Sequence, residues 1–144
     1  MTTYLCAHHL CSIEQDEPRA LQAWNQLMQR GVKAYVECRI EAAEIYFCAA
    51  LDVVEVRAAQ PDNAIFGEMQ WRKPAEFLLN LWLGMGEQNK ILRLSERIAG
   101  LYLLCGAESL LQFQASIEEQ ITVSSGDLNM QSGWPPENMA QGVQ

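Results

Sequence analysis

The most informative segment for the fold is EAAEIYFCAALDVVEVRAA, which runs from Glu41 to Ala59. Its apolar residues recur at three- and four-residue steps, as is typical of a helix: Ala43, Tyr46, Phe47, Ala50, Val53 and Val54. The opposite, narrow side carries the acidic residues Glu41, Glu44, Asp52 and Glu55. A helix that is apolar around most of its circumference must be covered by neighbours on more than one side. We therefore predict a central, largely buried helix and interpret the four carboxylates as a solvated stripe.

The rest of the chain repeats this helical periodicity and offers no pair of strands. We predict helices over about 16–36, 41–59, 74–86, 90–105 and 108–121. Pro74 is placed to open the third of these helices, because proline is tolerated in the first turn. The residues before it are expected to form a packed loop with one helical turn. The prediction is an all-α fold of about five helices in antiparallel hairpins.

The two ends of the chain differ in composition from this helical centre. Residues 1–15 are a segment that contains cysteines and histidines and can form a short amphipathic helix. Residues 16–122 are expected to be a single α-helical domain. Residues 123–144 are rich in Ser, Gly, Pro, Asn and Gln and have no apolar period, so we expect a mobile tail.

The overall composition indicates a soluble protein with a sizeable core. Of the 144 residues, 49% are hydrophobic, which is ample for one domain. The net charge of −8 repels phosphate backbones and acidic lipids, so we expect neither a nucleic acid nor a membrane as partner. No stretch approaches the roughly 18 apolar residues of a membrane span, and no secretory signal is recognisable. We therefore expect a cytoplasmic protein.

One glycine inside the helical pattern stands out. Gly31 interrupts the helix predicted over 16–36, where a glycine costs about 1 kcal/mol relative to alanine. The usual reason for accepting that cost is the close approach of another backbone. A brief turn at 37–40 follows, so this helix and the central one should form an antiparallel hairpin.

The residues of this hairpin resemble the tetratricopeptide repeat, a helix–turn–helix unit. The small, aromatic and small residues that this family places after its glycine fall on Ala43, Phe47 and Ala50. In such a unit the small residues let the helices approach, and Phe47 would fill the groove between successive helices. A fainter second copy begins at Trp82. The fold is therefore expected to be either tetratricopeptide-like or an irregular helical bundle.

The resemblance implies a non-catalytic module that binds another protein or a peptide, as an adaptor, a regulator or a small chaperone. Small acidic members of the family also serve bacterial secretion systems as substrate chaperones. The partner would lie in a groove lined by the first helix of each hairpin. The candidate partner-binding residues on that helix are Trp24, Met28, Arg30 and Tyr35. A homo-oligomer is left open.

The tail adds one further candidate for partner binding. Trp134 precedes Pro135 and Pro136, which impose an extended polyproline II geometry. An exposed tryptophan beside such a segment can anchor in a groove of a partner. The alternative is a linker without any partner.

The sharpest local feature is the run Cys6-Ala7-His8-His9-Leu10-Cys11, which holds both histidines and two of the five cysteines. Thiolate and imidazole are the ligands that zinc prefers, and Cys6 and His9 would share one face of a helix, as would His8 and Cys11. A single short helix cannot turn all four groups to one point, although Cys38 could supply another ligand. The alternative function is a metal- or redox-responsive regulator with zinc as cofactor; otherwise we expect no cofactor.

No sequence motif identifies a reaction. There is no glycine-rich phosphate loop, no G-x-S-x-G and no H-E-x-x-H. The helical carboxylates do not form the Glu-x-x-His pairs of diiron bundles, because neither histidine has a glutamate three residues before it. We therefore expect a protein that is not an enzyme.

Overall fold

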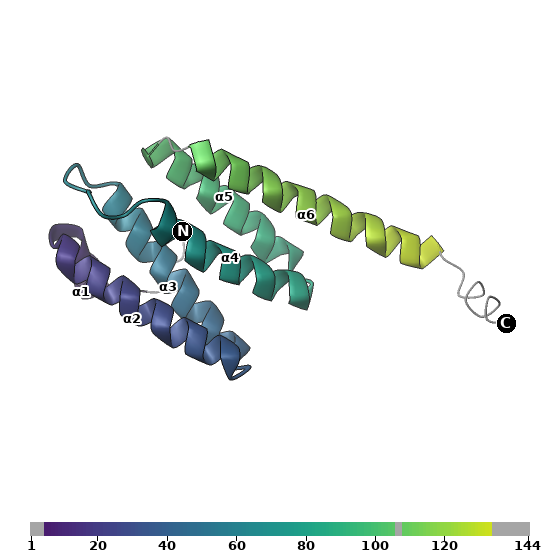
Figure 1. Cartoon of the computed structure of the whole chain (residues 1–144), viewed down its shortest axis with the longest axis horizontal. Helices are drawn as coiled ribbons and strands as arrows, with labels where there is room; N and C mark the ends of the chain where they lie inside the picture. The colour runs from purple at the N-terminus through teal and green to yellow at the C-terminus, as the bar shows by residue number, and fades with distance from the viewer. Residues whose placement is uncertain (1–4, 106–107, 134–144) are drawn as a thin grey trace.

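The computed structural model describes residues 5–105 and 108–133, and this part of the chain is all-α, as predicted (Figure 1). Its six helices are α1 (Ala7–Gln15), α2 (Glu17–Val36), α3 (Ile40–Ala58), α4 (Glu68–Met85), α5 (Gln88–Cys105) and α6 (Glu108–Gly133). The count exceeds the expected five because the N-terminal segment forms α1. None of the described helices is both long and apolar enough to cross a membrane.

The helices pack largely in chain order. Contacts join α2 to α3, α3 to α4, α4 to α5 and α5 to α6, while α1 lies against α2 and α3. Figure 1 shows this progression from α1 and α2 on one side of the molecule to α5 and α6 on the other. The end of α6 extends past the other helices. The fold is therefore a series of antiparallel neighbours with α3 between α2, α4 and α5.

The α2–α3 hairpin is held by the contact predicted around Gly31. A Cβ placed on Gly31 would lie 2.6 Å from Cε1 of Phe47, so no larger residue fits there without a shift. Phe47 is fully buried and stacks on Phe77 of α4, with ring centroids 4.6 Å apart and planes 9° from parallel. The aromatic ring thus fills the space between successive helices. The burial of the central helix is confirmed, because its apolar residues from Phe47 to Val54 are all buried.

The turn between α2 and α3 is a Schellman motif with an unusual residue at its left-handed position. Cys38 has a φ of 61°, a conformation that favours glycine. The Cys38 N–H donates to the carbonyl of Tyr35, and the Arg39 N–H donates to that of Ala34. These bonds close the end of α2 and direct the chain straight into α3.

The start of α4 corrects the sequence prediction. The helix begins at Glu68, so Pro74 lies inside it, and the residues just before Pro74, which were expected to form a packed loop with one helical turn, are helical from Glu68 onward. The Gly67 N–H donates to the side chain of Gln70 at 2.9 Å, which satisfies an N–H at the helix start. Pro74 has no N–H for the carbonyl of Gln70, four residues earlier, but Trp24 Nε1 donates to that carbonyl at 3.0 Å. This bond from α2 makes an internal proline tolerable in α4.

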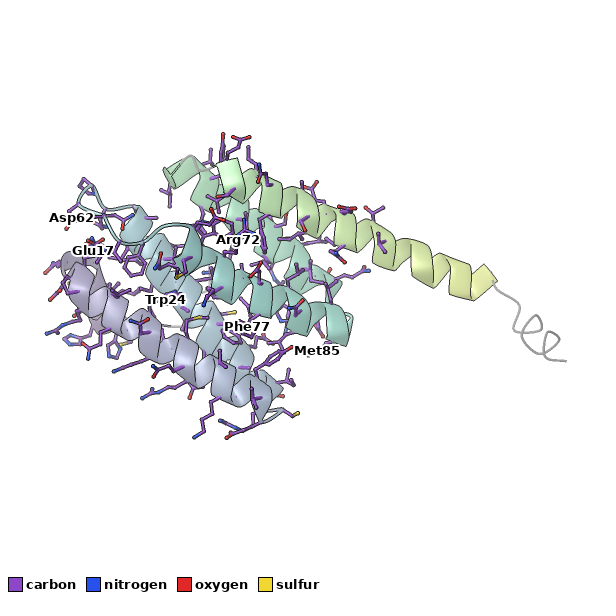
Figure 2. The ribbon with its side chains drawn as sticks, viewed as in Figure 1. Glu17, Trp24, Asp62, Arg72, Phe77 and Met85 are labelled. Atoms are coloured by element: carbon purple, nitrogen blue, oxygen red, sulfur yellow. The ribbon has the colours of Figure 1, made fainter. Side chains whose placement is uncertain are left out.

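A buried arginine fixes the loop between α3 and α4. The guanidinium of Arg57 is fully buried and donates to the carbonyl of Glu14 at 2.6 Å and to Asp62 at 3.0 Å. It also forms an ion pair of 3.3 Å with Glu17, whose carboxylate accepts the N–H groups of Ala64 and Ile65. Figure 2 shows Glu17 and Asp62 close together at this end of the molecule. The network ties α1, α2, α3 and the loop to one another.

The end of α6 also differs from the sequence prediction. The helix continues to Gly133, beyond the residue where the apolar period ends at Ile121. Among residues 108–123, the part of α6 whose burial is described, the buried side chains are those of Leu110, Phe113 and Ile117. The apolar pattern could not indicate this extension, because the added turns carry no apolar period. Residues 134–144, the rest of the predicted tail, lie outside the described residues.

Candidate partner-binding groove

A groove between α3 and α5 has a volume of about 1020 Å³. We call it the α3–α5 groove. It is lined by three residues of α3, one of α4 and nine of α5: Glu44, Cys48, Glu55, Trp82, Lys90, Arg93, Leu94, Glu96, Arg97, Gly100, Leu101, Leu103 and Leu104. The charged lining residues of α5, with Leu94 among them, lie within residues 90–97, and Gly100, Leu101, Leu103 and Leu104 follow. The groove therefore has a mainly polar half along residues 90–97 and an apolar half along residues 100–104.

Ion pairs between α3 and α5 build the polar half. Arg97 donates to Glu55 through two nitrogens, at 2.7 and 3.0 Å, and to the buried Asp52 at 2.8 Å. Burial alone would lower the pKa of the Arg97 guanidinium, but its bonds to Glu55 and the charges of Glu55 and Asp52 raise that pKa above its usual value. Lys90 donates to both carboxylate oxygens of Glu44, at 3.0 and 3.1 Å. These pairs join α5 to α3 along the groove.

The ion pairs also correct the interpretation of the acidic stripe on α3. Glu41 is exposed, as expected. Asp52 is buried, and Glu44 and Glu55 are only 17% and 16% exposed at their side chains. The stripe is not a solvated face, because α5 covers most of it with cations. The carboxylates therefore orient a neighbouring helix.

The apolar half of the groove exposes leucines to solvent. Leu103 is 84% exposed and Leu104 is 50% exposed. Gly100 lies one turn earlier on α5, and a Cβ placed on it would meet no atom within 4 Å. At Gly31 a larger side chain would collide with Phe47, whereas at Gly100 nothing in the described structure excludes one. A mid-helix glycine beside exposed leucines leaves room for another backbone to approach α5.

The wall of the groove contains one polar atom without a partner. Trp82 is 6% exposed, and its Nε1 donates to no acceptor among the described residues. A buried N–H without an acceptor costs roughly 1–3 kcal/mol. An acceptor brought by a bound molecule would remove that cost.

A second, smaller pocket of 510 Å³ lies between α4 and α6. Its lining is mostly polar: Arg72, Glu76, Leu79, Asn80, Gln112, Phe113 and Ser116. The Arg72 guanidinium lies over the rings of Trp71 and Phe113, 5.2 and 5.7 Å from their centroids, and also pairs with Glu68 at 2.9 Å. Arg72 therefore joins α4 to α6 and is engaged within the protein.

The predicted partner-binding residues on α2 do not form one surface. Trp24 and Met28 are buried, with exposures of 6% and 7%, so neither side chain is available to contact a partner. Both belong to the hydrophobic core, and the Trp24 indole donates to the backbone of α4. Arg30 is exposed, and Tyr35 is 36% exposed with its ring edge-on to Phe77 at 5.4 Å. Trp134 lies outside the described residues.

The cysteines and histidines of α1 are brought together only as a pair. Cys6 Sγ lies 3.1 Å from His9 Nδ1, as their spacing on a helix predicts. Cys11 instead accepts from Gln15 Nε2 at 3.7 Å, and no group of three or more metal-ligating side chains forms in the described structure. Cys38 lies in the turn after α2, at the opposite end of that helix from α1. The four-ligand site on Cys6, His8, His9 and Cys11 is thus not assembled within one chain.

Sequence reasoning missed the α3–α5 groove, although one signal was available. The buried residues of α5 keep a helical period through Ile91, Leu94, Ile98 and Leu101. Leu103, two residues after Leu101, departs from that period and faces away from the core.

Comparisons with known proteins assign no family to this arrangement: no family model, no curated protein and no solved structure matches the chain. Function must therefore be argued from the surface itself.

Proposed function

We propose that this protein is a non-catalytic binding module that holds a helix or peptide segment of another protein in the α3–α5 groove. The observation that carries the proposal is the open backbone at Gly100 beside the exposed Leu103 and Leu104. Exposed leucines beside a groove are typical of protein-interaction sites, and an unpacked helical glycine permits close approach.

The two halves of the groove define the chemistry of the partner segment. Its apolar side chains would cover Leu103 and Leu104, and a hydrogen-bond acceptor would reach towards Trp82. Arg93 and Glu96 are exposed and form no ion pair among the described residues, so they are available to polar groups of the partner. The net charge of −8 favours a partner with a basic surface, because opposite charge accelerates encounter. Because the groove has a polar half and an apolar half, the partner segment is amphipathic.

The resemblance of the first hairpin to tetratricopeptide repeats supports the same class of function, but it would place the partner on a different face of the protein. In that family the partner lies along the first helix of each hairpin, which here corresponds to α2, α4 and α6. The pocket on this face is half the volume of the α3–α5 groove, and the Arg72 guanidinium in it is already paired. We therefore favour the α3–α5 groove.

Site-specific photo-cross-linking in the source cell tests the proposal. A benzophenone side chain is introduced separately at Leu103, at Leu104, at Leu92 and at Gln112. Leu92 is the matched control, because it is a leucine of α5 with 48% exposure that does not line the groove. Gln112 probes the pocket between α4 and α6.

We expect a discrete adduct with a second protein at positions 103 and 104 and none at position 92. An adduct at position 112 alone would contradict the proposed groove and favour the face used by tetratricopeptide repeats. The absence of an adduct at all four positions, or equal adducts at 92 and 103, would overturn the binding proposal.

A further inference from the structure

The N-cap residue Cys6 and the first turn of α1 place two metal-ligating atoms side by side. Cys6 Sγ and His9 Nδ1 are 3.1 Å apart, and both side chains are exposed. The Leu10 N–H donates to the carbonyl of Cys6 at 3.0 Å, so the helical turn itself holds the three-residue spacing. The pair is therefore preformed.

The geometry of this pair is close to that of two zinc ligands. Zinc lies about 2.3 Å from a thiolate sulfur and about 2.0 Å from an imidazole nitrogen in tetrahedral sites. Two such ligands are then roughly 3.6 Å apart. Small side-chain rotations would open the pair by the required distance of about half an ångström.

One chain supplies only half of the ligands that a structural zinc needs. Structural sites are almost always four-coordinate. No third His, Cys, Asp or Glu joins the pair in the described structure, and the His8 ring is tilted by 58° to that of His9, with centroids 6.1 Å apart. Two further ligands must come from another molecule.

A second copy of the same chain can supply these ligands. Among the helices, α1 packs on α2 and α3, and it lies at one end of the bundle (Figure 1), so another copy can approach it. A two-fold axis through the metal would pair Cys6 and His9 with the same two residues of the partner. Two chains of charge −8 repel each other, so the contact would depend on the metal.

We propose that Cys6 and His9 form half of a zinc site that the same pair of a second copy completes. Zinc then joins two thiolates and two neutral imidazoles, and each Cys6 thiol loses its proton to solvent as its sulfur binds the metal. No electron is transferred. This site is separate from the α3–α5 groove and does not depend on the function proposed for it.

The test uses the full chain without a His tag, kept reduced, with zinc as the probe. One variant carries Cys6→Ser and His9→Asn. The matched control carries Cys11→Ser and His8→Asn, which removes the same residue types from the same helix. Zinc content after dialysis, molar mass by light scattering and proton release in weak buffer are measured for each. The far-ultraviolet circular dichroism of each variant shows whether it is folded.

For the unaltered chain and the control variant we expect about 0.5 equivalent of zinc per chain and a doubling of molar mass on adding zinc. About two protons should be released per zinc. The Cys6/His9 variant should lose all three effects while remaining folded. Absence of bound zinc, zinc bound by a monomer, or equal loss in both variants would overturn the proposal.

Discussion

The indole Nε1 of Trp24 donates a hydrogen bond of 3.0 Å to the backbone carbonyl of Gln70. This carbonyl is the one that Pro74 leaves without its helical donor. A side chain of α2 therefore completes the backbone of α4. The same bond explains why Trp24 is buried in the core and is not part of a partner-binding face.

Replacing Trp24 with phenylalanine tests this relationship. The variant keeps an aromatic ring and removes the donor, so the Gln70 carbonyl loses its partner. We expect the free energy of unfolding to fall by about 1–3 kcal/mol, as measured by urea denaturation. In a Pro74→Ala background the backbone regains an N–H that can donate to this carbonyl, so the same replacement should cost less. Equal costs in the two backgrounds would contradict the account.

The contact between Gly31 and Phe47 predicts the effect of adding a single methyl group at position 31. The Cβ of a Gly31→Ala variant would lie 2.6 Å from Cε1 and 2.9 Å from Cδ1 of Phe47. Overpacking of this kind costs about 1–3 kcal/mol, which outweighs the gain of about 1 kcal/mol in helix propensity. Urea denaturation should show a net loss of stability. The loss of stability caused by Gly31→Ala should be smaller in a Phe47→Leu background, which lacks the ring. If the stability losses of the two substitutions simply add in the double variant, the ring is not the cause of the Gly31→Ala effect.

The left-handed turn at Cys38 predicts a stabilising substitution. Glycine adopts a φ of 61° without the steric cost of a Cβ, which is roughly 1–2 kcal/mol. Part of this gain is offset by the greater freedom of glycine in the unfolded chain, so we expect Cys38→Gly to stabilise by about 1 kcal/mol. Thermal unfolding of Cys38→Ala serves as the control, because alanine removes the thiol and keeps the Cβ. If alanine stabilises as much as glycine, the thiol and not the backbone is responsible.

The carboxylate of Glu17 predicts how stability depends on pH. The N–H group of Ala64 lowers its pKa most, burial opposes this, and the N–H of Ile65 and the charge of Arg57 lower it further. The pKa in the folded protein is thus below the ordinary value of 4.5. A group of this kind contributes stability above its unfolded pKa, and that contribution is lost as the pH falls through the folded pKa.

Glu17→Gln should therefore destabilise the protein at pH 7, and the difference from the unaltered chain should shrink below pH 4.5. Urea midpoints measured from neutral to acidic pH give this comparison. Glu41→Gln is the control, because Glu41 is exposed and forms no ion pair among the described residues. A Glu17→Gln difference that does not change with pH would contradict the role assigned to the carboxylate.

Short-range pattern sufficed to predict the burial of α3 and its close contact with α2. The apolar circumference of α3 predicts its burial, and the glycine at 31 predicts a close helix contact, because both depend on spacing within one or two helices. The predicted start of α4 was wrong. Proline commonly opens a helix, but here a hydrogen-bond donor far away in the sequence lets Pro74 lie inside the helix. Trp24, which satisfies the freed carbonyl, is 46 residues away in sequence from Gln70.

The candidate groove could not be derived from the sequence for a similar reason. Arg97 pairs with residues 42 and 45 positions earlier, and only the packing of α5 on α3 reveals these pairs. A helical pattern shows which residues are apolar but does not show which neighbour covers them. Met28 was therefore expected on the surface and is buried, while Leu103 follows the buried Leu101 and is exposed.

The replacement Gly100→Ala tests whether the backbone of a partner lies over α5 at this glycine. A Cβ at position 100 meets no atom within 4 Å, so alanine should raise the free energy of unfolding by up to about 1 kcal/mol. The same methyl group would obstruct the backbone of a bound segment, so the adduct formed by the benzophenone at position 103 should decrease severalfold. A more stable protein with a weakened adduct is the predicted result. A more stable protein with an unchanged adduct would contradict the claim that a partner backbone lies over Gly100.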